Sequence, residues 1–328
     1  MPLSPDALYY MYSCTKPMTA ALGMRLVEEG RLDLDAPVSR YLPEFASLTV
    51  HDGEGARPAA REMTVRHLFT MSGGLNYNLG GEDIRSFLEK RGGDASTREI
   101  VGVFAERPLD FEPGTRYQYS LCHDVLAAVI AVAAGMPYSE YMRRTVFHPL
   151  GMTNSFFFDT EEVHARITPQ YIVDGERAVP FEKSNPYHIT PSYESGGAGL
   201  ICSASDYAKF ADTMACGGEA KNGYRLLKPE TVDLLRTEQM TALGIDNFDC
   251  CAGAEYGYGL GVRTRVGITG ERGSLGEFGW DGAAGSYVLM DPAEKLSIFF
   301  ATHLRGWPAM ILGVHTDIRD MVYEILDL

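Results

Sequence analysis

At residues 9–32 the chain reads YYMYSCTKPMTAALGMRLVEEGRL. Ser13 is followed three positions later by Lys16, and apolar residues then recur at helical spacing. Pro17 fits the first turn of a helix, where a missing N–H costs little, and Gly30 supplies the stop. The segment therefore predicts a helix that begins at Ser13, with the serine hydroxyl and the lysine amine on one face.

A serine and a lysine at this spacing have two interpretations. A poorly solvated amine at the positive end of a helix loses its proton readily, so Lys16 would be able to accept the proton of a nucleophilic Ser13. The same residues also fit a helix-capping serine beside a surface lysine. The chain has 18 serines and 7 lysines, so chance matches are common and the spacing alone does not decide between the two.

Composition and charge narrow the class of protein. The chain has 328 residues, of which 45% are hydrophobic and 22% charged, as in an ordinary globular protein of one large or two closely joined domains. A net charge of −15 repels phosphate backbones and anionic lipid surfaces, so we expect neither nucleic acid nor a membrane as a partner. The apolar run 125–135 is too short to cross a membrane and predicts a buried helix.

Six cysteines are spread along the chain, and the only close pair is Cys250-Cys251. No Cys-x-x-Cys pair occurs, so we expect no metal site, and nothing indicates an organic cofactor. A chain of this length builds a core without disulfides. The cysteines are therefore interpreted as reduced thiols of a cytoplasmic protein.

Helical and strand-like patterns are segregated along the chain. Beyond the first helix, helices are expected at 64–75, 96–109, 122–135, 203–218 and 315–328, and strands at 256–267, 276–282, 285–292 and 295–303. This order predicts an α/β protein of the α+β type, with an antiparallel sheet flanked by helices and a helical insertion. We assign 1–45 and 195–328 to a discontinuous sheet domain and 46–194 to a mainly helical domain.

Seven segments in order carry a resemblance to a known family. They are PDALYYMYSCTKPMTA (5–20), HLFTMSGGL (67–75), PGTRYQYSLCHDVLAAVIAVAAG (113–135), HPLGMTNS (148–155), GGAGLICSASDYAKFADTM (196–214), YGYGLGV (256–262) and GWDGAAGSYVLMDP (279–292). Together they resemble the serine β-lactamase-like superfamily, which includes class C β-lactamases, D,D-peptidases, D-amino-acid amidases and β-lactamase-like carboxylesterases. The resemblance implies a β-lactamase/transpeptidase-like fold and hydrolysis through an acyl-enzyme.

The resemblance also implies roles for individual residues. Ser13 matches the nucleophile, Lys16 its proton partner and Tyr119 the catalytic tyrosine. Either Lys16 or Tyr119 is then the base, and the sequence leaves this open. The backbone N–H groups of Ser13 and Ala283 match the oxyanion hole.

Two departures from the family pattern concern the substrate. The second motif usually ends in Asn, but here that position is Leu121. The third motif usually begins with Lys or His, but here it reads Trp280-Asp281-Gly282. A buried carboxylate without a cation is costly to bind. We therefore expect a small-molecule carboxylic ester or neutral amide as the substrate rather than a β-lactam or peptide.

Other residues leave the substrate less defined. Asp281 either selects a cationic substrate or is a solvated turn residue. His123, one helical turn after Tyr119, either faces the cleft or is structural, and His303 has the same two interpretations. The candidate substrate contacts are Leu121, Trp280, Asp281, Gly282 and His123. Four arginines are candidates to lend a charge from neighbouring segments: Arg263, Arg265, Arg272 and Arg305.

The position of Ser13 raises a further expectation. In the family a helix and two sheet strands precede the nucleophile, whereas twelve residues precede Ser13. We expect these strands to be missing and the apolar strand 295–303 to have an open edge, where a strand-donating partner chain or second copy would pair. Two alternatives to an esterase remain: a β-lactamase, D,D-peptidase or D-aminopeptidase, and a non-catalytic penicillin-binding-like sensor module.

Overall fold

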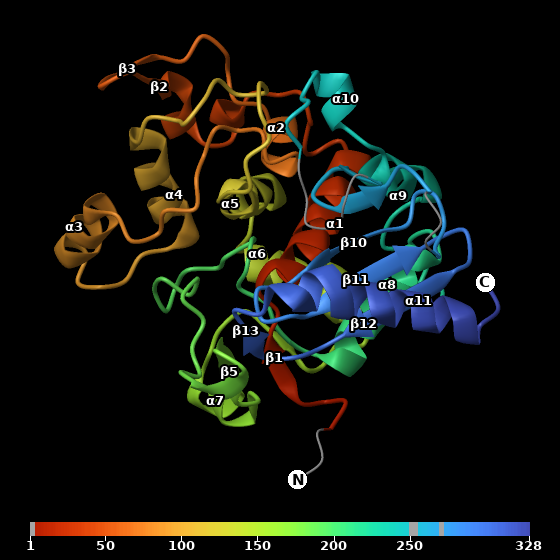
Figure 1. Cartoon of the computed structure of the whole chain (residues 1–328). Coiled ribbons are helices and arrows are strands. Elements are labelled where there is room, and N and C mark those ends of the chain that lie inside the picture. Colours follow the sequence, from red (N-terminus) through yellow and green to blue (C-terminus); the bar gives the residue numbers. More distant parts are fainter. Residues whose placement is uncertain (1–3, 249–254, 269–271) are drawn as a thin grey trace.

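The computed structural model describes residues 4–248, 255–268 and 272–328. Its main sheet has five antiparallel strands in the order β12-β11-β10-β9-β8 (Figure 1). These strands are β8 (Tyr256–Tyr258), β9 (Arg263–Arg265), β10 (Phe278–Asp281), β11 (Tyr287–Asp291) and β12 (Leu296–Phe300). The predicted antiparallel sheet near the C-terminus is therefore confirmed.

One predicted strand was wrong. The segment 256–267 forms the two strands β8 and β9 rather than one, because the chain reverses between them. Gly261 has φ +87°, a conformation that favours glycine. The N–H of Gly259 donates to the carbonyl of Val262 at 2.8 Å and closes the turn.

The predicted helices are all present, with shifted ends. The α-helices are α1 (Thr15–Glu28), α2 (Val65–Phe69), α3 (Glu82–Lys90), α4 (Thr97–Glu106), α5 (Cys122–Ala134), α6 (Tyr138–Met142), α7 (Glu161–Arg166), α8 (Ala204–Ala215), α9 (Pro229–Arg236), α10 (Met240–Leu243) and α11 (His315–Ile325). Thr64, Ser96 and Ser203 cap α2, α4 and α8 with their side chains. Figure 1 shows α2 to α5 gathered on one side of the sheet region.

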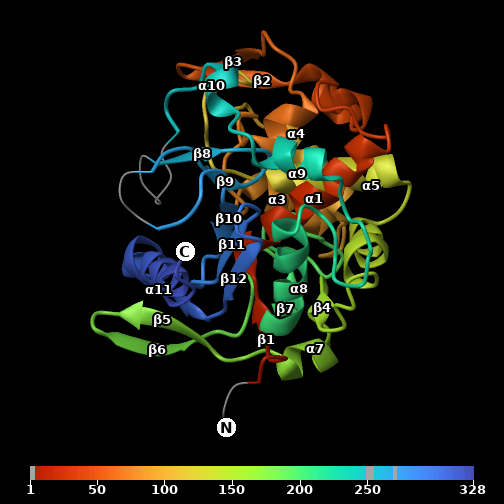
Figure 2. The same ribbon diagram turned by 90° about the vertical axis from the view of Figure 1, so that its right-hand side faces the viewer.

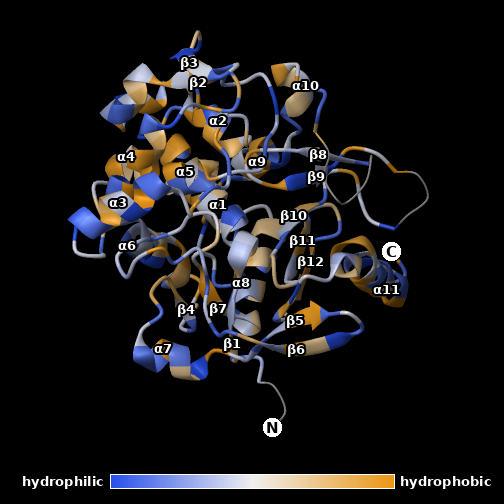
Figure 3. Cartoon of the chain, turned by 60° about the vertical axis from the view of Figure 1, so that its left-hand side comes forward, coloured by the Kyte–Doolittle hydropathy of each residue, from blue (hydrophilic) through white to orange (hydrophobic). Residues whose placement is uncertain are grey.

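Helices cover both faces of the main sheet (Figure 2). Side chains alternate across a strand, so neighbouring residues meet different helices. On one face, Leu289 and Ile298 pack with Tyr323 of α11. On the other face, Phe299 stacks on Tyr207 of α8 with a ring distance of 4.2 Å. The helix α5 is almost wholly apolar, as Figure 3 shows, and it packs against α1, α2 and α4.

Three smaller sheets were not predicted. One has the order β1-β7-β4, a second β13-β5-β6, and β2 pairs with β3. Their strands are β1 (Leu8–Tyr10), β2 (Thr49–Asp52), β3 (Gly55–Pro58), β4 (Ser155–Phe156), β5 (Gln170–Asp174), β6 (Arg177–Phe181), β7 (Ile201–Ser203) and β13 (Leu304–Arg305). Strand β1 ends three residues before Ser13, so this sheet positions the nucleophile candidate.

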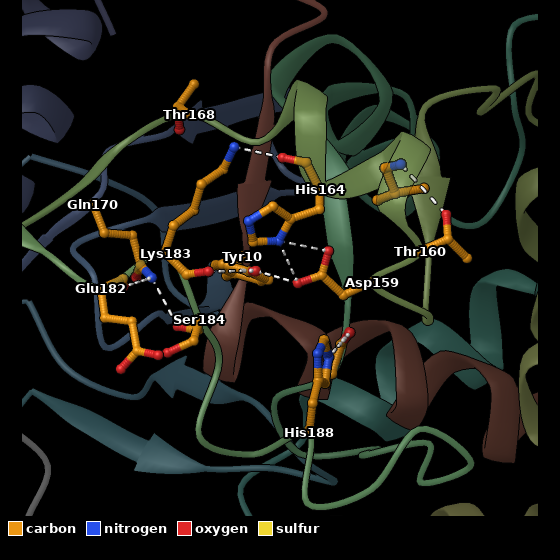
Figure 4. Close-up of polar contacts among 12 residues, drawn as sticks. Tyr10, Asp159, Thr160, His164, Thr168, Gln170, Glu182, Lys183, Ser184 and His188 are labelled. Carbon is orange, nitrogen blue, oxygen red and sulfur yellow. Dashed lines mark hydrogen bonds and ion pairs between the residues drawn. The ribbon is translucent and has the colours of Figure 1, made fainter.

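A polar cluster ties β1 to the segment around α7 (Figure 4). The hydroxyl of Tyr10 donates to the carboxylate of Asp159, which also lies 3.1 Å from Nδ1 of His164. Lys183 donates to the carbonyl of His164. The N–H of Tyr10 donates to Nε2 of His303 at 2.7 Å, so the structure gives His303 a structural place beside β1.

Several other expectations concern the molecule as a whole. Among the described residues β12 pairs with β11 alone, so its second edge is open within this chain.

The division of the chain into two domains at residues 45 and 195 stays a prediction. Within the described ranges, no single helix is long and apolar enough to cross a membrane, and one bent pair, 122–134 with 138–147, passes that test by length and composition only.

Four of the six cysteines lie among the residues that the structure describes. Cys14, Cys122, Cys202 and Cys216 are free thiols. Cys250 and Cys251 lie outside the described residues. In the part of the chain that the structure describes, no group of three or more His, Cys, Asp or Glu side chains is arranged to hold a metal ion.

Candidate active site

Ser13 lies in a short 3-10 turn, Tyr12–Cys14, rather than at the first position of an α-helix. Tyr12, the first residue of this turn, has φ +47°, an uncommon conformation for a residue with a side chain. Helix α1 begins at Thr15, and no side chain caps either helix start. The interpretation of Ser13 as a capping serine is therefore wrong.

Lys16 is fully buried and points at Ser13. Its Nζ donates to Ser13 Oγ at 3.1 Å, to the carbonyl of Gly197 at 2.8 Å and to the hydroxyl of Tyr77 at 3.2 Å. Burial lowers the pKa of Lys16 to about 7, against an opposing effect of Asp124. Near neutral pH a large fraction of this amine is therefore uncharged and able to accept a proton. The interpretation of Lys16 as a surface lysine is also wrong.

Tyr119 completes the constellation from the loop before α5. Its hydroxyl donates to Ser13 Oγ at 2.6 Å, and Nζ of Lys16 lies 4.5 Å from the centre of its ring. Nε1 of Trp280 donates to the Tyr119 oxygen at 3.2 Å. Burial raises the pKa of Tyr119, so its phenol keeps its proton at neutral pH. The resting site therefore favours Lys16 over Tyr119 as the group that accepts the serine proton.

The expected oxyanion hole lies where two turns meet. Ser286, just after the turn that holds Gly282 and Ala283, donates from its hydroxyl to the carbonyl of Met11 at 3.3 Å. A Cβ on Gly282 would lie 2.6 Å from that carbonyl, so only glycine allows this approach. The assignment of the N–H groups of Ser13 and Ala283 to the oxyanion hole stays a prediction.

Aromatic rings enclose the site. Trp280 stacks on Tyr119 with a ring distance of 5.6 Å, and Tyr77 stacks on Tyr119 at 5.5 Å. Tyr187 meets Tyr77 edge-on at 5.5 Å. The structure thus places Trp280 beside the catalytic candidates, as the third motif predicted.

Two expected substrate contacts are buried and present no surface to a substrate, so these predictions were wrong. Leu121 is 2% exposed and lines a small cavity with Leu75 and Phe104, because its side chain turns into the core at the start of α5. His123 is fully buried, and a Cβ on Gly261 would lie 2.8 Å from its ring. Burial lowers the pKa of His123 to about 3, which makes it a neutral structural residue.

Asp281 is committed to partners inside the protein rather than to a turn in solvent. Arg263 donates to its carboxylate at 2.7 Å, and Nδ1 of His315 lies 3.3 Å away. Burial raises the pKa of Asp281, but Arg263 and His315 outweigh burial and hold this pKa below its ordinary value. Selection of a cationic substrate by Asp281 therefore has no support in its contacts.

The four candidate arginines also have other contacts. Arg263 pairs with Asp281, and Arg265 with Glu255 at 3.0 Å. Arg272 donates to the carbonyl of Leu328, at the end of the chain. The guanidinium of Arg305 lies between the rings of Tyr12 and Phe181, at 5.5 Å and 5.1 Å from their centres. None of these contacts places a cation at Ser13.

Sequence reasoning missed Tyr77, Asp124 and Gly197. Tyr77 and Gly197 both accept from Lys16, and Asp124 is fully buried on α5 close to it. A signal existed for Asp124, since it is the one carboxylate in the apolar run CHDVLAAVIAVAA. The other two lie in loops whose path only the tertiary structure defines.

The sheet with its helical layers and the serine–lysine–tyrosine site define a protein of the serine β-lactamase-like class. The comparisons agree, since a family model described as Beta-lactamase matches residues 1–315. The chain belongs to the Beta-lactamase family.

The chain is similar to an esterase, to a penicillin-binding protein and to a hydrolase of known structure. The chain is similar to esterase EstB of Burkholderia gladioli, with 31% identity over 98% of this chain and 83% of the relative. It is also similar to penicillin-binding protein 4 of Amycolatopsis lactamdurans, with 27% identity over 89% and 71%. Among solved structures, EstCE1, a hydrolase with promiscuous acyltransferase activity, aligns with TM-score 0.79 and 25% identity over 98% and 86% of the two chains.

Proposed function

We propose that this protein is a serine hydrolase that cleaves small carboxylic esters, or neutral amides, through an acyl-enzyme. One observation carries the proposal: Ser13 Oγ lies within hydrogen-bond distance of both the buried amine of Lys16 and the hydroxyl of Tyr119. The proposed base and the proposed proton donor thus both contact the oxygen of the proposed nucleophile. The similarity to EstB and EstCE1 supports hydrolysis of esters.

The chemistry follows from the two protonation states. Uncharged Lys16 accepts the Ser13 proton as Oγ bonds to the acyl carbon, and the N–H groups of Ser13 and Ala283 stabilise the oxyanion. As the ester C–O bond breaks, the Tyr119 phenol gives its proton to the leaving alkoxide, and the Lys16 ammonium returns a proton to Tyr119. Water then attacks the acyl-enzyme with the same residues in reversed roles. The net reaction consumes one ester and one water and yields an acid and an alcohol.

The contacts at the third motif support an uncharged substrate. Trp280 contributes an aromatic ring and an N–H instead of a cation, and the arginines nearby contact other groups. A free carboxylate at this position would lose its hydration without gaining a charged partner. Esters and neutral amides avoid that cost.

Two activity assays separate this proposal from its alternatives. We expect turnover of p-nitrophenyl butyrate and little hydrolysis of nitrocefin. Strong nitrocefin turnover without esterase activity would instead support a β-lactamase or D,D-peptidase, to which the similarity with penicillin-binding protein 4 lends weight. Stable acylation without turnover of either substrate would support a sensor module.

We also propose a pairing partner and a cellular compartment for the protein. The open edge of β12 is the place where a strand of another chain or a second copy would add to the main sheet. Free, buried thiols at Cys14, Cys122 and Cys202 are compatible with a reducing compartment such as the cytoplasm.

A further inference from the structure

Asp124 is a fully buried carboxylate close to the candidate base, and the proposed mechanism does not use it. Its Oδ1 accepts hydrogen bonds from the hydroxyl of Tyr193 at 2.9 Å and from Ser195 Oγ at 2.6 Å. The carbonyl of Gly197, two residues further on, accepts from Lys16. One loop therefore fixes both the lysine and the carboxylate.

The position that a Cβ of residue 197 would occupy faces both the Asp124 carboxyl and the Lys16 amine. A Cβ added to Gly197 would lie 2.7 Å from Asp124 Oδ2, 3.4 Å from the Tyr77 hydroxyl and 3.5 Å from Nζ of Lys16. The Asp124 carboxyl and the Lys16 amine are thus near neighbours, although no ion pair within 4.0 Å joins them. At such separations in a buried site, a unit charge changes the free energy of its neighbour strongly.

No other ionised group faces Lys16 from the described residues around it at neutral pH. Burial raises the pKa of Cys14 to about 12 and of Cys122 to about 11, and it lowers the pKa of His123 to about 3. Burial raises the pKa of Asp124 above its ordinary value, and Ser195, Lys16 and Tyr193 offset only part of that rise. The remaining polar neighbours are the neutral hydroxyls of Ser13, Tyr77 and Tyr119.

We propose that Asp124 is a positioning residue that sets the charge state of Lys16 during acyl transfer, with Tyr193 and Ser195 holding its carboxylate toward the lysine. This inference rests on the proposed function. When the serine proton moves from Ser13 Oγ to Lys16 Nζ, a cation forms on a fully buried side chain. An unpaired buried cation is costly, and the carboxylate of Asp124 offsets that cost.

The direct test is an NMR titration of the chain labelled with 13Cε-lysine. With 7 lysines in the sequence, the Lys16 resonance is assignable from its loss in Lys16→Met. Asp124→Asn should lower the pKa of Lys16 by about one pH unit or more, because the neutral amide no longer favours the ammonium form. An unchanged titration of Lys16 would overturn the proposal. This readout does not depend on turnover, so it separates failure of this inference from failure of the proposed function.

A matched control removes a different buried aspartate. Asp206 is 1% exposed, accepts from Asn154 and Ser155, and pairs with Lys209 at 2.8 Å, all on α8 and its surroundings. Asp206→Asn should leave the titration of Lys16 unchanged. An equal fall in the pKa of Lys16 in this variant would show a general effect of losing a buried charge and would overturn the proposal.

Milder variants cover the case in which Asp124→Asn does not fold. Tyr193→Phe and Ser195→Ala each remove one hydrogen bond to the carboxylate and keep its charge. Each should raise the pKa of Asp124 and lower that of Lys16, by less than Asp124→Asn. In active protein, the acid limb of kcat/KM should move to lower pH in the same order. If the pH at which kcat/KM falls on the acid side is the same in both variants as in the wild type, the proposal is contradicted.

Discussion

The hydroxyl of Tyr119 donates a hydrogen bond of 2.6 Å to Ser13 Oγ, although 106 residues separate the two in the chain. Lys16 approaches the same oxygen at 3.1 Å. Of the two candidate bases that the sequence left open, the lysine has its pKa lowered by burial and the tyrosine has its pKa raised. These opposite shifts assign different roles to the two residues and lead to the following predictions.

The first prediction concerns pH. The pKa of Lys16 is about 7, and the proposed mechanism uses its uncharged form as the base. Below this pH, kcat/KM for p-nitrophenyl butyrate should fall about tenfold per pH unit, and above it a plateau should appear. Lys16→Arg, which stays charged, should lose most activity at every pH. A profile that is flat between about pH 5 and 9 would argue against Lys16 as the base.

The second prediction concerns the leaving group. Tyr119→Phe removes the proposed proton donor and should lower kcat by about 10²- to 10⁴-fold for an alkyl ester such as ethyl butyrate. The loss should be much smaller for p-nitrophenyl butyrate, whose leaving group needs no proton. Tyr77→Phe serves as the control, since it removes a neighbouring tyrosine hydroxyl but leaves the Tyr119 donor in place. Equal losses for both esters in Tyr119→Phe would contradict the assigned role.

The third prediction concerns Trp280. Trp280→Phe keeps the stacked ring but removes the N–H that donates to Tyr119, a contact worth about 0.5–1.5 kcal/mol. We expect a loss of about two- to tenfold in kcat with KM nearly unchanged. Trp280→Lys should raise the ratio of nitrocefin to ester turnover, because it supplies the missing cation. A ratio that stays at the wild-type value would show that Trp280 does not exclude anionic substrates.

The fourth prediction concerns the open edge of β12. Ser297 lies on this strand opposite Met290 of β11, so Ser297→Lys places a charge on the edge strand. If another chain pairs there, light scattering after size exclusion should show fewer dimers or aggregates in this variant than in the wild type. Identical mass distributions at high concentration would count against pairing at this edge.

Much of the fold was predictable because local signals agree with it. Ser96 and Glu99 form the capping box that starts α4, and Gly135 ends α5 with φ +68°. The single strand expected at 256–267 was wrong because the turn at Gly261 interrupts a sequence pattern that is otherwise continuous. The small sheets were missed because strands of two to five residues leave almost no periodic signal.

Part of the candidate site was likewise predictable from the sequence and part was not. Ser13, Lys16, Tyr119 and Trp280 were predicted from ordered motifs, and the structure brings them together. Leu121 and His123 were misplaced because a position in a motif does not tell which way a side chain turns at the start of a helix. The direction of each depends on how α5 packs against its neighbours.

The central claim is that Ser13 is the nucleophile, and covalent labelling tests it most directly. Intact-mass spectrometry after treatment with a fluorophosphonate should show one adduct on the wild type, located on the peptide that contains Ser13. Ser13→Ala should remain unlabelled and lose at least about a thousandfold in esterase activity, with an unchanged thermal unfolding temperature. Equal labelling of the wild type and Ser13→Ala, or an adduct on another serine, would contradict the account.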